Sequence, residues 1–592
     1  MKLKFNSELT YQNDAISSIV DIFEGQETCK SMFTVEKKHR KKGEIFTKKE
    51  TIGTGNKLIL NEEALLENIK NIQLKNGLKQ SDSLNEMNFT VEMETGTGKT
   101  YVYLRTILEL NKKYGFTKFV IVVPSIAIKE GVNKSIEMTT QHFKQLYSNI
   151  NYDSFVYDSQ KLEQVRNFAI SDTIQIMIIN IDAFKKSFQD PSKETKANII
   201  HRFSDKLPDG YRPIDLIAET NPIVIIDEPQ SVDNTPKAKE AIKSLKPLCC
   251  LRYSATHREK YNIMYKLDSV DAYQNQLVKQ IEVSSVITED NVNLPYVKLL
   301  KLDNKNGIKA QIEIDENRSG KTVRNTKNVK KGSDLYEISN GREIYNNYIV
   351  DDIDLTPENE RIYFTNGESV ALGKAIGEVD DIQLKTIQIR KTIEKHLEKE
   401  LYLKNKGVKV LSLFFIDKVA NYRQYDEDNN ELKGKYAEIF EEEYKRLIKR
   451  PKYNTLFNNV DIETLPEKVH QGYFSIDKKG KAKDSTTGSS EDDENTYNLI
   501  MKDKEKLLSF ETNLKFIFSH SALKEGWDNP NVFQICTLNE TKSEMKKRQQ
   551  IGRGLRLCVN QDGERLHGFD VNTLTVVANE AFEDFAKDLQ KE

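Results

Sequence analysis

The residues with the clearest chemical potential lie in the run METGTGKT, from Met93 to Thr100. An apolar-alternating segment precedes it and a helix-like segment follows, which is the order of a phosphate-binding loop. Glycines let such a loop curve around an anion and aim backbone N–H groups at phosphate oxygens. The match is partial, because the complete phosphate-loop motif has glycine where this chain has Met93. Lys99 is placed to reach the β- and γ-phosphates of a nucleotide, and Thr100 to hold Mg²⁺. The predicted nucleotide contacts are Thr95, Gly96, Thr97, Gly98, Lys99 and Thr100.

A second candidate is the run IIDEPQ, which ends a Val/Ile-rich segment typical of a buried strand. Open α/β sheets bind ligands at the carboxyl ends of their strands, so Asp227 is predicted to hold Mg²⁺ and Glu228 to orient an attacking water. Buried adjacent carboxylates are costly without a cation, which favours this interpretation. A surface Asp-Glu pair at a strand end is also common, so the motif alone leaves both interpretations open. Gln230 is predicted to contact the nucleotide.

Two arginines in the run QQIGRGLRL form a third candidate, because Gln549, Gly552, Arg553 and Arg556 match the pattern QxxGRxxR. Residues three apart lie on one face of a helix. Offered across a cleft, the two arginines would stabilise charge developing on a γ-phosphate. A basic surface helix would also explain the arginines, but not the Gln and Gly at fixed offsets. Gln549 is predicted to contact the nucleotide.

Three shorter motifs, VVPS, SAT and GWD, are weak when taken singly, since each is also an ordinary polar turn. The single tryptophan, Trp527, is more simply a core anchor than a base-stacking residue. The residues predicted to couple the nucleotide site to nucleic acid are Pro124, Ser125, Ser254 and Thr256. Those predicted to sense the nucleotide are Gly526 and Asp528.

The elements that must position these residues form two α/β blocks separated by a polar, β-rich stretch. Continuous Val/Ile runs alternating with helical segments indicate buried parallel strands. The predicted domains are an N-terminal lobe (1–283), a β-rich insertion or linking domain (284–380) and a C-terminal lobe (381–592). The strands are predicted at 89–93, 118–124, 174–180, 222–229, 249–253, 408–416, 515–520, 533–538 and 574–579. Helices are predicted at 1–26, 61–74 and 381–403, an irregular basic stretch at 27–60 and a solvent loop at 484–495.

The composition suits a soluble protein with a heavily charged surface, at 38% hydrophobic and 30% charged residues. The net charge of −2 gives no global evidence of a polyanion partner, and the local basic clusters at 37–42, 445–452, 478–483 and 546–548 are more often solvated faces. No apolar run approaches the ~20 residues of a membrane span, and the N-terminus lacks a signal-peptide core. The five cysteines form no CxxC pair, so we expect a cytoplasmic location.

The order of the motifs resembles that of superfamily-2 helicases and translocases: phosphate loop, VVPS, DEPQ, SAT, GWD and QxxGRxxR. This likeness implies an α/β fold with two RecA-like parallel-sheet lobes, ATP between them, and a β-rich insertion. DEPQ, in place of DEAD or DEAH, is similar to the Res subunit of type III restriction enzymes. So are the segments 265–283, 388–400, 408–422, 519–540, 547–557 and 572–592. By this likeness Gln12, after Tyr11, corresponds to an adenine-reading glutamine.

Membership of that family implies an ATP-driven, Mg²⁺-dependent motor acting on double-stranded DNA. It also implies a Mod methyltransferase subunit as partner, which carries S-adenosylmethionine and reads the recognition site. The catalytic residues would be Lys99, Asp227, Glu228, Arg553 and Arg556, with Mg²⁺ on Thr100 and Asp227. No membrane association is implied.

One departure from the family concerns the nuclease domain, which follows the motor lobes in such proteins. Only 36 residues follow Arg556 in the 592-residue chain, so we expect the nuclease to lie on another polypeptide or a longer chain. The apolar stripe Phe582, Phe585 and Leu589 needs a partner surface. Two alternatives remain: a free-standing DNA or RNA helicase of the same superfamily, and an inactive remnant that binds ATP or Mod.

Overall fold

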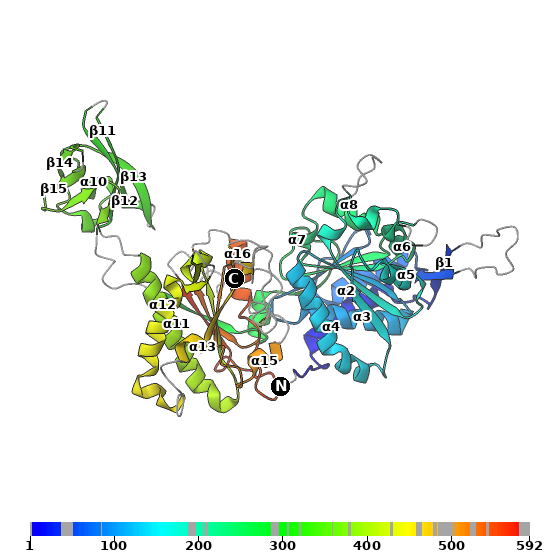
Figure 1. Cartoon of the computed structure of the whole chain (residues 1–592). Coiled ribbons are helices and arrows are strands. Elements are labelled where there is room, and N and C mark those ends of the chain that lie inside the picture. The colour runs from blue at the N-terminus through cyan, green and yellow to red at the C-terminus, as the bar shows by residue number, and fades with distance from the viewer. Residues whose placement is uncertain are drawn as a thin grey trace.

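A computed structural model (Figure 1) gives the architecture of most of the chain. It describes residues 3–36, 51–84, 86–186, 197–204, 207, 211–285, 295–304, 307–318, 321–357, 359–376, 381–426, 430–456, 465–476, 482–483, 500, 504–520, 529–539 and 544–578. The predicted loop at 484–495, the GWD motif and the stripe from Phe582 to Leu589 lie outside these ranges.

The first lobe is built on a parallel seven-stranded sheet in the order β5-β6-β4-β7-β8-β3-β9. Alternate residues of the interior strand β4 enter two different cores, which is the two-faced burial that its continuous apolar run predicts. Its strands are β3 (Asn88–Met93), β4 (Lys118–Val123), β5 (Tyr152–Val156), β6 (Ile174–Asn180), β7 (Ile223–Asp227), β8 (Cys249–Ser254) and β9 (Ile263–Leu267).

Helices cover both faces of this sheet. One core contains α1 (Thr10–Val20), α2 (Glu62–Lys75), α3 (Lys99–Tyr114) and α4 (Ile126–Leu146). The other contains α5 (Leu162–Ile170), α6 (Pro213–Glu219) and α8 (Pro236–Ser244). The predicted helix at 61–74 is confirmed, with the Asn61 side chain capping α2 by accepting from the Ala64 N–H.

The N-terminal region differs from its prediction in two ways. The helix predicted over 1–26 is shorter, because α1 begins at Thr10 and a 3-10 turn follows it at Asp21–Phe23. The stretch at 27–60, predicted to be irregular, contains the antiparallel strands β1 (Lys30–Glu36) and β2 (Thr51–Asn56). Asn56 fixes this hairpin to the lobe by donating to the Lys118 carbonyl, a distant contact without local sequence signal.

The second lobe is a parallel six-stranded sheet in the order β10-β26-β25-β18-β24-β21. Its strands are β10 (Gln280–Ser285), β18 (Leu411–Phe415), β21 (His470–Tyr473), β24 (Phe516–Ser519), β25 (Val532–Thr537) and β26 (Thr573–Ala578). The helices around it are α11 (Asp381–Leu403), α12 (Lys435–Ile448), α15 (Lys504–Leu508) and α16 (Glu544–Gly552). Figure 1 shows the two parallel-sheet lobes side by side.

Strand β10 crosses the boundary expected between the lobes. It lies largely inside the range 1–283 predicted for the first lobe, yet pairs in parallel with β26 of the second. The pairing partner is almost 300 positions away in the chain, since Ile281 faces Leu574. The order of elements along the sequence does not indicate this pairing.

Between the lobes in sequence, the predicted β-rich stretch forms two antiparallel sheets around one core. The first sheet has the order β13-β12-β11-β17 and the second β14-β15-β16. Their strands are β11 (Val297–Asp303), β12 (Lys309–Arg318), β13 (Lys321–Val329), β14 (Val350–Asp354), β15 (Arg361–Phe364), β16 (Ser369–Ala371) and β17 (Ala375–Ile376). In Figure 1 this unit stands apart from both sheets of the lobes, in green.

Candidate active site between the two lobes

The phosphate-loop motif has the predicted strand, loop and helix context. β3 ends at Met93 and α3 begins at Lys99. Gly96 and Gly98 have φ angles of +93° and +97°, in the left-handed region that favours glycine. A Cβ at Gly98 would also lie 2.6 Å from the Gln12 Nε2. Both glycines are therefore needed for this loop conformation, and the backbone amides around them can face an anion.

Lys99 links the loop to the DEPQ motif. Its Nζ donates to the Met93 carbonyl at 3.2 Å and lies 3.7 Å from the Glu228 Oε1. The side chain is only 11% exposed, so its charge acts in a partly dehydrated setting where electrostatic attraction is stronger than in water. An ammonium placed in this way can bind phosphate oxygens.

Tyr11 and Gln12, at the start of α1, also contact the phosphate loop. The Gln12 Nε2 and the Tyr11 hydroxyl both donate to the Thr97 carbonyl, at 2.9 and 3.0 Å. Gln12 is 4% exposed. The N-terminal helix is thus tied to the phosphate loop, whereas the adenine contact of Gln12 stays a prediction.

Asp227 ends β7 beside the loop helix. It is 7% exposed, and the Tyr103 hydroxyl donates to its Oδ2 at 3.4 Å. Burial and the neighbouring carboxylate raise the pKa of Tyr103 well above its ordinary value, so Tyr103 stays a donor. Tyr103 is not among the site residues predicted from the sequence. Its spacing of three from Thr100 places both on one helix face and was the available signal.

Glu228 is the centre of the hydrogen bonds that join the motifs. Its φ of +56° is strained for a residue with a side chain, a feature concentrated at functional sites. Its Oε2 accepts from the Gln230 Nε2 at 2.6 Å and from the Ser254 hydroxyl at 2.7 Å. The Thr256 N–H in turn donates to the Ser254 Oγ at 3.1 Å. DEPQ and SAT are therefore one connected unit, and a nucleotide contact by Gln230 stays a prediction.

The arginine motif has a different local structure from the predicted one. Helix α16 ends at Gly552, so Arg553 lies in a turn and Arg556 in an extended segment that bridges Val278. The prediction that both arginines lie on one helical face is wrong. After the helix, Gly554 packs closely on β26, where an added Cβ would meet a Leu574 methyl at 2.5 Å.

Arg556 nevertheless lies directly against the phosphate loop of the other lobe. A Cβ built at Gly96 would lie 3.3 Å from the Arg556 Cγ. A Cβ at Gly552 would lie 3.1 Å from the Thr95 Cγ2. The structure thus brings the loop of the first lobe and the QxxGRxxR segment of the second into contact.

Several predicted residues are not joined to this cluster by a described contact. Ser125 caps helix α4, because its hydroxyl accepts from the Ile128 N–H at 3.3 Å, and Pro124 precedes it. Gly526, Trp527 and Asp528 lie outside the described residues, as does the side chain of Gln549. Their proposed roles stay predictions.

The basic cluster at 445–452 is a solvated face with acidic partners. Arg446, Arg450 and Lys452 form ion pairs with Glu443, Glu394 and Glu398, respectively. The cluster at 37–42 lies outside the described ranges. Compensated charges make the 445–452 face a poor candidate for phosphate contacts.

The residues of the cluster fit a nucleoside triphosphate with Mg²⁺. Left-handed glycines, a lysine and an arginine suit phosphates, and the Thr100 hydroxyl with the Asp227 carboxylate suits a hard cation that keeps water and phosphate ligands. Among the described residues, no group of three or more His, Cys, Asp or Glu side chains could hold a metal by itself.

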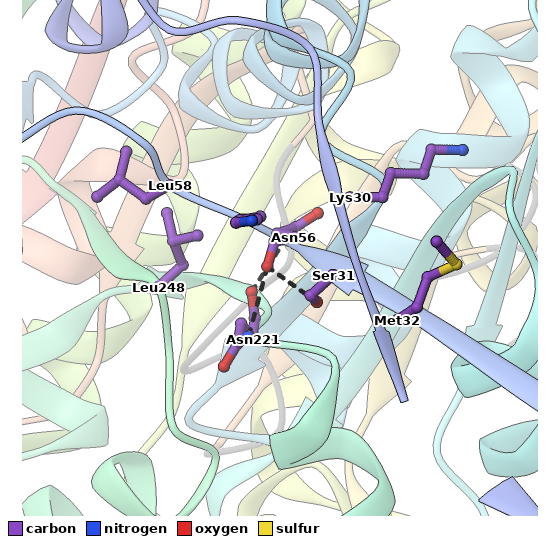
Figure 2. A pocket seen from close by; sticks show the side chains of 8 residues that line it. Lys30, Ser31, Met32, Asn56, Leu58, Asn221 and Leu248 are labelled. Atoms are coloured by element: carbon purple, nitrogen blue, oxygen red, sulfur yellow. Dashed lines mark hydrogen bonds between the residues drawn. The ribbon is translucent and has the colours of Figure 1, made fainter. Parts of the chain in front are cut away.

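A separate open groove of about 590 Å³ lies beside the β1–β2 hairpin (Figure 2). The Asn56 amide in its lining is already engaged, because it donates to the Lys118 and Asn221 carbonyls. It contains none of the predicted site residues. Its lining residues are Lys30, Ser31, Met32, Asn56, Lys57, Leu58, Asn221 and Leu248.

Comparison with known families agrees with this geometry. A family model described as "Type III restriction enzyme, res subunit" matches residues 9–259, which include Gln12, the phosphate loop and the DEPQ–SAT unit. This part of the chain is therefore similar to the Res-subunit family. The likeness to Res subunits extends into the second lobe, as the relatives below indicate.

Two curated Res subunits are similar to most of this chain. The EcoP15I Res subunit of Escherichia coli is 32% identical over 525 residues, covering 85% of this chain and 51% of the relative. The EcoPI Res subunit of Escherichia phage P1 is 32% identical over 526 residues, with the same coverage of 85% and 51%. The chain spans about half the length of the curated relatives it matches.

Solved structures give a weaker likeness. The DNA- and AMP-PNP-bound helicase Lhr of Mycobacterium smegmatis has a TM-score of 0.41 and 12% identity, covering 85% of this chain and 46% of that one. The ATP-dependent Type ISP restriction-modification enzyme LlaBIII, bound to DNA, has a TM-score of 0.39 and 11% identity. The match covers 90% of this chain and 30% of that one. Within the part of the chain that the structure describes, no helix is long and apolar enough to cross a membrane.

Proposed function

We propose that this chain is the ATP-hydrolysing motor of a type III restriction-modification system, moving on or switching along double-stranded DNA. The observation that carries the proposal is the contact of Arg556 with the phosphate loop of the other lobe. A site divided in this way makes hydrolysis depend on how the lobes sit together. Binding, hydrolysis and release of ATP can then be converted into lobe movement on DNA.

In this proposal each side chain of the cluster has a distinct task. Lys99 and the loop amides bind the phosphates, and Thr100 with Asp227 holds Mg²⁺, which neutralises charge on the transferred phosphoryl group. Glu228 orients the attacking water, while Ser254 and Gln230 fix its carboxylate by donating to Oε2. Arg556, together with Arg553, stabilises charge that develops on the γ-phosphate.

The proposed partners are double-stranded DNA and a Mod methyltransferase subunit that carries S-adenosylmethionine, in the cytoplasm. The support is the similarity to Res subunits of type III enzymes over most of the chain. The proposal covers the motor and not DNA cleavage.

Co-expression with a type III Mod methyltransferase subunit tests this partnership. We expect the two proteins to co-purify and the complex to release phosphate faster with duplex DNA than with single-stranded RNA. A chain that binds no methyltransferase and responds to RNA alone would instead be a free-standing helicase. A chain that binds ATP or Mod without hydrolysing ATP on any nucleic acid would be an inactive remnant.

Ser254→Ala is expected to lower the turnover of DNA-stimulated ATP hydrolysis about tenfold, because a charge-assisted hydrogen bond to Glu228 contributes roughly 1.5 kcal/mol. ATP binding should be unchanged, since the phosphate loop is not touched. Ser244→Ala is the matched control, because the Ser244 hydroxyl donates to the Ala241 carbonyl elsewhere in the first lobe. Equal turnover of the two variants in a steady-state phosphate-release assay would remove Ser254 from the coupling unit.

A further inference from the structure

Lys279 lies in the connection from the first lobe to β10, beside the arginine segment. Its N–H donates to the Leu555 carbonyl at 2.8 Å, and the preceding residue, Val278, bridges Arg556. The side chain is 1% exposed. The sequence motifs do not include this lysine, and neither the nucleotide site nor the sheet requires a charge here.

The Lys279 ammonium donates hydrogen bonds to three main-chain carbonyls. Its Nζ donates to Pro530 O at 2.6 Å, to Gly554 O at 3.0 Å and to the carbonyl of Arg556. An ammonium has three N–H donors, so each one has its own acceptor. Two of the three acceptors flank Leu555 in the segment that ends at Arg556. The Phe533 ring, centred 4.7 Å away, covers the charge.

Burying the charged Lys279 side chain costs free energy, so its hydrogen bonds to the carbonyls matter for keeping it charged. Burial first, and then the charges of Lys399 and Arg556, lower the pKa of Lys279 to about 7. The carbonyl acceptors oppose this effect because they stabilise the charged form. Loss of the side chain would leave the carbonyls of Gly554 and Arg556 without this donor in the interior.

We propose that Lys279 is a positioning residue that holds the Gly554–Arg556 segment, and with it the Arg556 side chain, against the phosphate loop. The inference rests on the proposed function, because its effect is read through ATP hydrolysis. A Cβ built at Gly96 would lie 3.3 Å from the Arg556 Cγ, so the segment packs directly against the loop. A misplacement of about 1 Å at a catalytic group can cost about 100-fold in rate.

Lys409 provides a matched control in the same lobe. It is 3% exposed, burial lowers its pKa to about 7, and its Nζ donates to the Ser509 and Thr512 carbonyls. These acceptors belong to the α15 region and not to the arginine segment. Replacing Lys409 should therefore reproduce the loss of a buried, hydrogen-bonded lysine without moving Arg556.

The test compares Lys279→Met with Lys409→Met in the full chain, measuring ATP binding, turnover with duplex DNA and thermal unfolding. We expect Lys279→Met to keep its ATP Kd within about threefold and to lose about 100-fold in kcat, the cost of a misplaced catalytic group. Lys409→Met should keep kcat within about threefold while losing comparable stability. Lys279→Gln keeps an N–H donor group, so its kcat should fall less than that of Lys279→Met. It replaces Lys279→Met in the comparison if that variant does not fold.

A double-mutant cycle separates positioning from a general structural role. If Lys279 acts through Arg556, the kcat of Lys279→Met combined with Arg556→Ala equals that of Arg556→Ala alone. Multiplicative losses, or equal kcat values for Lys279→Met and Lys409→Met, overturn the inference while the motor proposal stands. If the wild-type chain hydrolyses no ATP on any nucleic acid, the motor proposal fails first.

Discussion

Lys99→Ala is expected to reduce DNA-stimulated phosphate release by about 10³-fold, because an ammonium that contacts the transferred phosphoryl group has no substitute in the site. The expectation follows from the position of Lys99 at the first turn of α3, 11% exposed and 3.7 Å from Glu228. Phosphate release at saturating ATP and duplex DNA measures the effect. Binding of a fluorescent ATP analogue shows how much of it arises from lost affinity.

Lys113→Ala is the control for this variant. Lys113 lies in the last turn of the same helix and forms a surface ion pair with Asp21, so its loss removes a charge without touching the loop. Its rate should stay within about twofold of wild type, as expected for a surface pair. A Lys99→Ala variant that hydrolyses ATP as fast as Lys113→Ala would show that the loop does not bind the reacting phosphates.

The second large effect is expected for Arg556→Ala, with kcat lower by about 10³-fold and ATP affinity nearly unchanged. An arginine that acts on transition-state charge typically contributes at least this factor. It reaches the site from the second lobe, so its loss should leave the phosphate loop, Gln12 and Asp227 intact. Steady-state kinetics with duplex DNA give kcat, and equilibrium titration with an ATP analogue gives the affinity.

Arg446→Ala is the matched control in the same lobe, since Arg446 pairs with Glu443 on the surface of α12. Arg553→Ala tests the neighbouring arginine, which lies in the turn after α16. If Arg553→Ala loses turnover and Arg556→Ala keeps it, the arginine that acts on the γ-phosphate is Arg553. If neither variant loses turnover, the second lobe does not complete the site.

Much of the fold could be predicted because burial leaves a local pattern. Strands such as β4 and β7 are continuous Val/Ile runs, and α11 coincides with the predicted helix at Asp381–Leu403. The glycine-rich loop is also local, since the positive φ of Gly96 and Gly98 is a property of residue type. These features need no knowledge of distant partners.

The features that escaped prediction depend on partners far away in the chain. Helix α16 ends at Gly552, and the close packing of Gly554 on Leu574 then constrains the path toward Arg556. The bond from Ser254 to Glu228 spans 26 positions, and the bond from the Lys279 side chain to Gly554 spans 275. Sequence motifs indicate which residues do chemistry, whereas these contacts decide how they are held.

If one ATP molecule is held between the two lobes, a disulfide placed across them should respond to the nucleotide. A Cβ at Gly552 would lie 3.6 Å from the Thr95 Cβ, within the ~3.5–4.5 Å that a disulfide requires. Thr95→Cys and Gly552→Cys are combined in a Cys29→Ser background, because the other native cysteines are buried. Each single variant, and the pair with Lys99→Ala, serve as controls.

We predict that the pair forms an intramolecular disulfide under mild oxidation, and that a non-hydrolysable ATP analogue with Mg²⁺ accelerates its formation several-fold. The Lys99→Ala background should abolish the acceleration, because the nucleotide then loses its main phosphate contact. Failure of the pair to form the bond, or a rate that the nucleotide leaves unchanged or lowers, would contradict an ATP site shared by the two lobes.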